Sequence, residues 1–137
     1  MSVKRERIQP DKLHVRKVGD KVLYSHVVMV EAPGGRQIFI AGQTPRDRDG
    51  NCVGLGDMRA QIEQVGENIK AALEAAGASL ADIVKTTTYV TDMDEYFRHQ
   101  DMRMRYLGAA LPTSTTVQVV RLSRPEFLVE IEALAIV

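Results

Sequence analysis

Residues 57–77 read DMRAQIEQVGENIKAALEAAG and form the most regular stretch of the chain. Large apolar side chains recur there every three or four residues, so in a helix they lie on one stripe that packs against another element. Asp57 can accept hydrogen bonds from the free N–H groups of the first turn, and Gly77 is a typical helix end. Gly66 costs about 1 kcal/mol against alanine inside a helix, and a close approach to the sheet would explain its presence. The predicted stripe is Ile62, Val65, Ile69, Leu73 and Ala76.

The segments on both sides of this helix are rich in β-branched and aromatic residues, which favour strands. The sequence Pro33-Gly34-Gly35 interrupts two such segments and predicts a hairpin turn. A polar, glycine-bearing loop over residues 44–56 leads into the helix. The expected strands are residues 13–18, 22–30, 37–41, 83–91, 113–122 and 127–137.

A second helix is expected over residues 94–107. Asp94 can cap its first turn, and Gly108 stands at its end. The candidate inward-facing residues of this helix are Phe97, Met104 and Leu107.

The order of elements predicts an α+β fold in which a mixed β-sheet carries the two helices on one face. Residues 1–12 are polar and are expected to form a loosely held N-terminal arm, followed by a single domain over residues 13–137. The second face of the sheet also needs a cover. With no chain left to provide one, we expect a further copy of the protein to pack there.

The final strand supports this expectation through its alternation. Val129, Ile131 and Ala133 fall on one face, while Glu130 and Glu132 fall on the other. Two carboxylates on one sheet face need water or polar partners. They form either a solvated face or the lining of a cavity between subunits.

Composition narrows the class of protein. The 18 basic and 18 acidic residues cancel to a net charge of zero, and no basic track indicates a nucleic-acid partner. No apolar run is long enough to span a membrane, and no signal peptide is recognisable. The single cysteine, Cys52, excludes an intrachain disulfide and favours a reducing, cytoplasmic location. The three histidines show no metal-ligand spacing, so no metal site is expected. The sequence has neither a phosphate-binding glycine loop nor a dinucleotide fingerprint, so no organic cofactor is expected.

Six short segments stand in a distinctive order: YSH at 24–26, AGQTP at 41–45, EAAGA at 74–78, DIVKTT at 82–87, YVTDM at 89–93 and VEIEA at 129–133. Together they resemble the RidA family, also called YjgF/YER057c/UK114 and, in older usage, endoribonuclease L-PSP. The resemblance extends from about residue 20 to the C-terminus.

This resemblance implies a chorismate-mutase-like α+β fold and a homotrimer with three small-molecule clefts at its subunit seams. Members of the best-known branch hydrolyse reactive enamine or imine intermediates to ammonia and a 2-oxo acid, without a metal or an organic cofactor. Ribonuclease activity is disfavoured in this chain, which has neither a basic track nor a pair of histidines spaced to act as acid and base.

The resemblance also assigns roles to residues of the cleft. Tyr24 corresponds to an aromatic wall, and Ala41-Gly42 to a loop that offers backbone N–H groups to the ligand. Gln100 corresponds to a helix position that often holds asparagine, and Glu130 to the carboxylate that activates water. Each residue also has a structural interpretation: Tyr24 as an interface aromatic, Gln100 as helix surface and Glu130 as a solvated strand residue.

The main departure lies in residues 112–117, PTSTTV. Deaminase members carry an arginine where this chain has Ser114, and Thr116 is the next residue on the same strand face. A guanidinium holds a carboxylate with two charged prongs, which a serine hydroxyl does not reproduce. The loss of one charge-assisted contact costs about 1.5–3 kcal/mol. The arginines that could supply a substitute cation are Arg36, Arg46, Arg103 and Arg121.

Three functions therefore stay open from the sequence. In the first, the cleft binds a less anionic small molecule while Glu130 still acts on water. In the second, the protein is an ordinary 2-iminobutanoate/2-iminopropanoate deaminase with a substitute cation. The third is a non-catalytic trimer that binds a ligand or acts like a chaperone.

Overall fold

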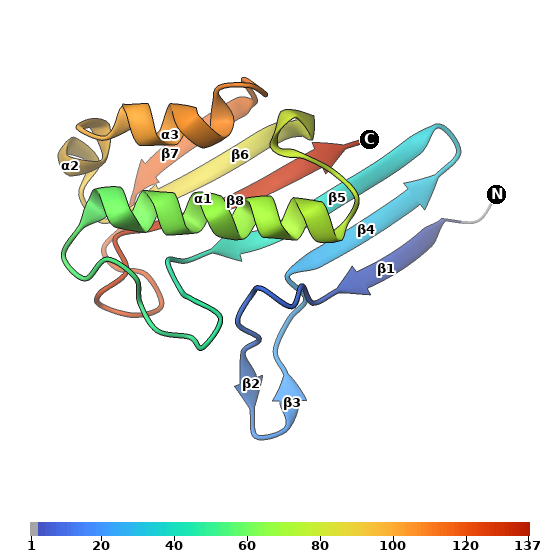
Figure 1. Cartoon of the computed structure of the whole chain (residues 1–137), viewed down its shortest axis with the longest axis horizontal. Helices are drawn as coiled ribbons and strands as arrows, with labels where there is room; N and C mark the ends of the chain where they lie inside the picture. The colour runs from blue at the N-terminus through green and yellow to red at the C-terminus, as the bar shows by residue number, and fades with distance from the viewer. Residues whose placement is uncertain (1–2) are drawn as a thin grey trace.

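A six-stranded mixed sheet carries the fold in the computed structural model, which describes residues 3–137 (Figure 1). All neighbouring strands pair antiparallel except the last two in the spatial order, which are parallel. The mixed sheet and the α+β class are therefore confirmed. In spatial order the strands are β1 (Lys4–Ile8), β4 (Val27–Ala32), β5 (Gly35–Gln43), β8 (Val129–Ile136), β6 (Ile83–Val90) and β7 (Thr113–Gln118), and β2 (Lys17–Val18) forms a separate small hairpin with β3 (Lys21–Val22).

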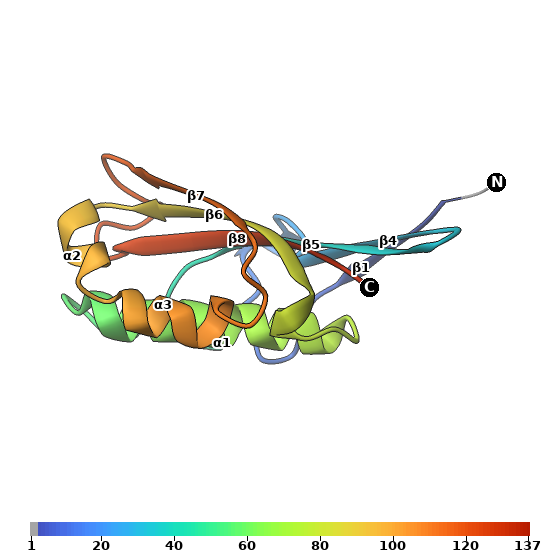
Figure 2. The ribbon, with the colours of Figure 1, turned by 90° about the horizontal axis from the view of Figure 1, so that it is seen from above.

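The two longest helices lie on one face of this sheet, as Figure 2 shows from above. The longest begins where it was predicted, because the Asp57 carboxylate accepts a hydrogen bond from the Ala60 N–H at 3.0 Å. It ends just before Gly77, which takes the left-handed conformation at φ +75°. The predicted stripe from Ile62 to Ala76 is buried in the core. The helical elements are α1 (Met58–Ala75), a 3-10 turn η1 (Leu80–Asp82), α2 (Met93–Phe97) and α3 (Gln100–Leu107).

Gly66 is explained by a neighbouring helix rather than by the sheet. A Cβ at this position would lie 2.5 Å from two ring carbons of Tyr106, on α3. The Tyr106 hydroxyl in turn donates to the Glu67 carboxylate at 2.7 Å, so the ring is held in place. The glycine therefore permits close packing of α1 against α3.

The N-terminal region differs from the prediction. Lys4–Ile8, expected within a loose polar arm, form β1 and pair with β4 at the edge of the sheet. Residues 1–2 of the predicted arm lie outside the described residues. The strand was missed because an edge strand with charged residues shows no apolar alternation, and charge on an edge is a common protection against aggregation.

The strands predicted at residues 13–18 and 22–30 are also corrected. Within the first segment only Lys17–Val18 are extended, and they pair with Lys21–Val22. The second segment is broken, because residues 23–26 leave strand geometry before β4 begins at Val27.

Two helices replace the single helix expected over residues 94–107. Asp92, rather than Asp94, caps α2 by accepting from the Glu95 N–H at 3.0 Å. The interruption at residues 98–99 rotates α3 relative to α2. As a result Phe97 and Met104 are exposed, contrary to the prediction, whereas the prediction for Leu107 is confirmed. The buried residues of this region are Tyr96, Met102, Tyr106 and Leu107.

The last strand alternates as predicted, with Val129 and Ile131 buried beneath the helices and Glu130 and Glu132 on the opposite face. We call this opposite side of the sheet the open face. It carries large apolar side chains, since Phe39 is 44% and Ile136 47% exposed, and Val117 is 38% exposed. The described part of the chain leaves this apolar surface uncovered (Figure 2).

Candidate functional site

Glu130 is the second residue of β8 and lies beside the bulged end of β5. The register between these strands shifts between Ile40 and Gln43, so Gly42 sits in the irregular part of the pair. A Cβ on Gly42 would meet the Glu130 side chain, with Cδ at 2.9 Å and Cγ at 3.1 Å. The absence of a side chain at Gly42 therefore makes the space that the Glu130 carboxylate occupies.

The surroundings of Glu130 favour its protonated form. Burial raises the pKa of the Glu130 carboxyl above its ordinary value, and the negative charge of Glu132 raises it further. Arg46 acts in the opposite direction. Glu132 itself accepts a hydrogen bond from the Tyr89 hydroxyl at 2.6 Å. Glu130 makes no side-chain hydrogen bond among residues 3–137.

Arg46 is the cation whose positive charge acts to lower the pKa of Glu130. Its guanidinium carbon lies 5.0 Å from the ring centre of the buried Phe127, and the Arg124 guanidinium lies over the same ring at 5.3 Å. Burial lowers the pKa of Arg46, and Glu130 is among the groups that raise it. Its buried Nε has no hydrogen-bond partner within the described chain.

Tyr24 flanks this region from the loop before β4. Its ring is 41% exposed and meets the His26 ring edge-on, with the ring centres 5.5 Å apart. His26 is buried between two polar contacts: Nε2 lies 2.7 Å from the His14 carbonyl, and Nδ1 lies 3.1 Å from the Gln43 amide nitrogen. Nδ1 therefore accepts, Nε2–H donates, and burial lowers the pKa of this histidine.

The two backbone positions predicted to face a ligand are not equivalent. The Ala41 N–H donates to the His26 carbonyl at 2.8 Å. It is therefore already used within the protein, and the expectation of a ligand-facing N–H can apply only to Gly42.

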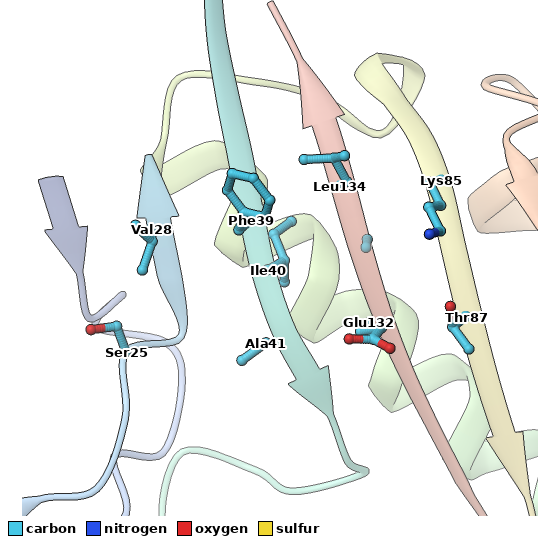
Figure 3. Close-up of a pocket in the computed structure, with 10 residues that line it drawn as sticks. Ser25, Val28, Phe39, Ile40, Ala41, Lys85, Thr87, Glu132 and Leu134 are labelled. Atoms are coloured by element: carbon cyan, nitrogen blue, oxygen red, sulfur yellow. The ribbon is translucent and has the colours of Figure 1, made fainter. Parts of the chain in front are cut away.

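A cavity of about 390 Å³ opens on the same face, next to Ala41. Figure 3 shows its apolar side formed by Phe39 and Leu134 and its polar side by Lys85, Thr87 and Glu132. Glu130 does not line this cavity. Among the lining residues, Ala41 was a predicted site residue and Glu132 was one of the two acids expected either on a solvated face or in a cavity lining. Lys85 and Thr87 were not predicted, although the alternation of β6 places them on the face opposite the buried Thr86 and could have indicated them.

Ser114 and Thr116 lie on the opposite face of the sheet. The Arg103 guanidinium on α3 donates from Nη2 to the Ser114 hydroxyl at 3.0 Å, so Ser114 faces the helices. Thr116 follows two residues later on the same face. Gln100, the first residue of α3, reaches the Tyr96 carbonyl at 3.4 Å.

One copy of the chain therefore separates the predicted site residues into two groups. Tyr24, Gly42 and Glu130 belong to the region around β5 and β8, whereas Ser114 and Gln100 belong to the edge near α3. Of the candidate cations, Arg46 belongs to the first group and Arg103 to the second. Arg36 lies near Met29 and Arg121 near backbone carbonyls of its own loop, so they join neither group.

Residues 3–137 contain no group of three or more histidine, cysteine or acidic side chains that could hold a metal ion. None of the described helices is both long and apolar enough to cross a membrane.

These features define a class: α+β proteins in which a mixed sheet backed by helices presents a half-buried carboxylate on its open face. The chain belongs to the family whose model is described as Endoribonuclease L-PSP, which matches residues 18–137. This is the RidA family, so the resemblance found in the sequence is confirmed.

Individual relatives agree with this membership. A RutC family protein of Pyrococcus horikoshii is 44% identical over 101 residues, covering 74% of this chain and 79% of that protein. The 2-iminobutanoate/2-iminopropanoate deaminase of Salmonella typhimurium is 35% identical over 105 residues, covering 74% and 80%. The crystal structure of RidA from an Antarctic Psychrobacter superposes with a TM-score of 0.79 at 33% identity, covering 96% of this chain and 99% of that one.

Proposed function

We propose that this protein binds a small molecule at the seams between identical copies and hydrolyses an imine or enamine there, with Glu130 as the base. The observation that carries the proposal is the state of Glu130. It is half-buried against Gly42, its pKa is raised by burial and by Glu132, and it has no side-chain partner among the described residues. A carboxylate of raised pKa is a stronger base toward water than an ordinary one.

The proposed reaction needs only water and the imine. Glu130 takes a proton from water as the water oxygen bonds to the imine carbon, and the imine nitrogen takes up a proton to give a carbinolamine. The protonated Glu130 then gives its proton to the amine nitrogen. The C–N bond breaks, ammonia leaves, the hydroxyl loses its proton and a 2-oxo acid remains.

The relative from Salmonella typhimurium supports this substrate class, since its name specifies 2-iminobutanoate and 2-iminopropanoate. These substrates are small and anionic. The 35% identity over 105 aligned residues supports the same bond cleavage in this protein.

Assembly is part of the proposal, because Glu130 and Ser114 lie on opposite faces of one copy. A site that uses both residues requires two copies. The apolar open face, with Phe39, Val117 and Ile136 exposed, supports such packing, since large exposed apolar surfaces commonly mark interfaces. We propose a homotrimer, whose mass by light scattering would be three times the 15.2 kDa of the chain. A monomer at micromolar concentration would contradict the seam site.

Ser114 supports an alternative, in which the cleft binds a less anionic ligand or acts without catalysis. The strand position lacks the guanidinium that deaminase members carry, so the protein would then bind the uncharged part of a ligand and leave imino acids untouched.

The decisive assay follows ammonia and 2-oxobutanoate release from freshly generated 2-iminobutanoate, above the spontaneous rate. Wild type is expected to accelerate the reaction, and Glu130→Gln to abolish the acceleration while it keeps the fold. Glu31→Gln is the matched control, because Glu31 is an exposed carboxylate on β4. Equal activity in wild type and Glu130→Gln would remove Glu130 from the chemistry, and a silent wild type would favour the alternative.

A further inference from the structure

Arg103 is a half-buried cation without a carboxylate partner. Its Nη2 donates to Ser114 at 3.0 Å, its Nη1 makes a long contact to the Met104 sulfur at 3.9 Å, and its charge also acts on the buried Tyr96 hydroxyl. It takes part in none of the ion pairs of residues 3–137, although Arg105 on the same helix lies 3.7 Å from Glu63. The charge of Arg103 is thus available to a ligand.

The polar groups behind Arg103 are also incompletely bonded. The hydroxyls of Thr86, Thr88 and Tyr96 are buried, with side chains at most 1% exposed, and have no hydrogen-bond partner in the described chain. Tyr96 lies beside both Arg103 and Thr88, which each influence its hydroxyl. These hydroxyls are closed to solvent, so Arg103 is the polar group of this region that an occupant at the edge of the sheet can reach.

The strand register places these groups on one side. Thr86 pairs with Ser114 and Thr88 with Thr116 in the parallel β6–β7 ladder, so the four side chains share the face beneath α3. Ser114 is exposed and Arg103 half-buried, so an occupant can reach them from the edge of the sheet. Arginine is the side chain best suited to hold a carboxylate with two parallel hydrogen bonds.

We propose that Arg103, positioned by Ser114, holds the carboxylate of a small 2-imino or 2-oxo acid at the β7 edge. The cation that the strand lacks at residue 114 is supplied from the neighbouring helix. The inference rests on the proposed function, because it specifies the substrate class of the same site. It makes Arg103 a specificity-determining residue.

Binding of 2-oxobutanoate, the stable product, tests this without any chemical step. The full-length protein is titrated with 2-oxobutanoate and with 2-butanone, which lacks the carboxylate, and binding is followed by NMR. Wild type is expected to bind the acid and not the ketone. Arg103→Gln is expected to weaken binding of the acid about 10- to 100-fold, the range for one charge-assisted contact.

Three further variants keep the result interpretable. Arg105→Gln, on the exposed side of the same helix, is the matched control and should bind like wild type. Arg103→Lys keeps the charge but loses the two parallel donors of the guanidinium, so its affinity for the acid should fall between those of wild type and Arg103→Gln. Ser114→Arg combined with Arg103→Gln should recover most of the affinity, because it returns a guanidinium to the same edge. Melting temperatures confirm that each variant is folded.

Each outcome separates this inference from the proposed function. Unchanged binding of the acid in folded Arg103→Gln would overturn the inference even if wild type hydrolyses imines. A loss confined to Arg46→Gln would instead assign the carboxylate to the cation beside Glu130. Binding through Arg103 without any imine hydrolysis would refute the proposed function alone.

A mixing experiment tests whether Arg103 and Glu130 serve one substrate across a seam. As pure proteins, Glu130→Gln is expected to be inactive, and Arg103→Gln to keep about a tenth or less of the wild-type rate at low substrate concentration. Co-refolded in equal amounts, they should recover about a quarter of wild-type activity, because random assembly pairs an intact Arg103 with an intact Glu130 at that fraction of seams. No recovery would contradict a site shared between copies.

Discussion

Gly42→Ala should impair turnover while leaving the fold intact. The substituted Cβ would lie 2.9 Å from the Glu130 Cδ and 3.1 Å from its Cγ, with a carboxylate oxygen closer still. The obstruction is the end of a flexible side chain, so Glu130 can rotate away. Gly42 is not among the residues with positive φ, so its backbone accepts alanine without strain.

The magnitude follows from the displacement. Relieving the contact moves the carboxylate by about 1 Å, and a misplacement of that size in a catalytic group costs on the order of 100-fold in rate, or about 2.7 kcal/mol of activation free energy. Stability should change little or rise by about 0.4–1 kcal/mol, because alanine restricts the unfolded chain more than glycine does.

The measurement is the 2-iminobutanoate assay together with denaturant unfolding. Gly42→Ala should show the loss of rate at an unchanged or slightly raised unfolding midpoint. In the Glu130→Gln background, where the base is already absent, the same substitution should lower the rate no further. Full activity in Gly42→Ala would refute the view that Gly42 makes room for the base.

Gly66→Ala should destabilise the protein by up to about 2 kcal/mol in denaturant unfolding, because overpacking against the Tyr106 ring costs about 1–3 kcal/mol and helix propensity returns about 1 kcal/mol. In a Tyr106→Ala background the effect should become stabilising, and an unchanged sign would contradict the contact. Glu132→Gln removes the like charge that raises the pKa of Glu130, so the acid limb of the pH profile of kcat/KM should move to lower pH. A shift to higher pH would be inconsistent with Glu130 as the base. The pKa of His26 is lowered on folding, so the contribution of this histidine to stability is present above pH 6.5, its ordinary pKa, and is lost as the pH falls below that value. His26→Gln should flatten this part of the pH profile of stability. An unaltered slope would assign this pH dependence to other groups.

The fold could be predicted where periodicity and burial coincide. The stripe from Ile62 to Leu73 identified α1, because a helix with one apolar face has few other ways to bury it. The alternation from Val129 to Ala133 likewise identified which face of β8 carries the acids. Apolar periodicity did not predict β1, because this strand is held by main-chain pairing at the edge of the sheet. Its exposed residues, Lys4 to Arg7, show no apolar alternation.

The sequence selected candidate site residues but did not predict their arrangement. The family resemblance selected Glu130 and Gly42, which the structure brings into contact. It also selected Ser114, which the structure places on the other face. Sequence order does not show which face of a sheet a residue occupies in relation to a distant strand, and it does not show that the Ala41 N–H is already bonded to His26. Arg103 could only be a candidate until α3 was placed over β7.

The presence of Arg103 determines what a substitution of Ser114 does to the protein. Its guanidinium already lies 3.0 Å from the Ser114 hydroxyl, so Ser114→Arg in the wild-type background would bring two like charges to about 4 Å, where they repel by about 1 kcal/mol in water and about 4 kcal/mol near a protein surface. We expect a lower melting temperature and no gain in 2-oxobutanoate binding from that single substitution, whereas the same substitution restores binding when residue 103 is glutamine. The sign of the effect therefore depends on Arg103. A Ser114→Arg variant that binds or turns over better than wild type while Arg103 is present would mean that the helix cation does not serve the strand position, and the carboxylate site would have to be sought elsewhere.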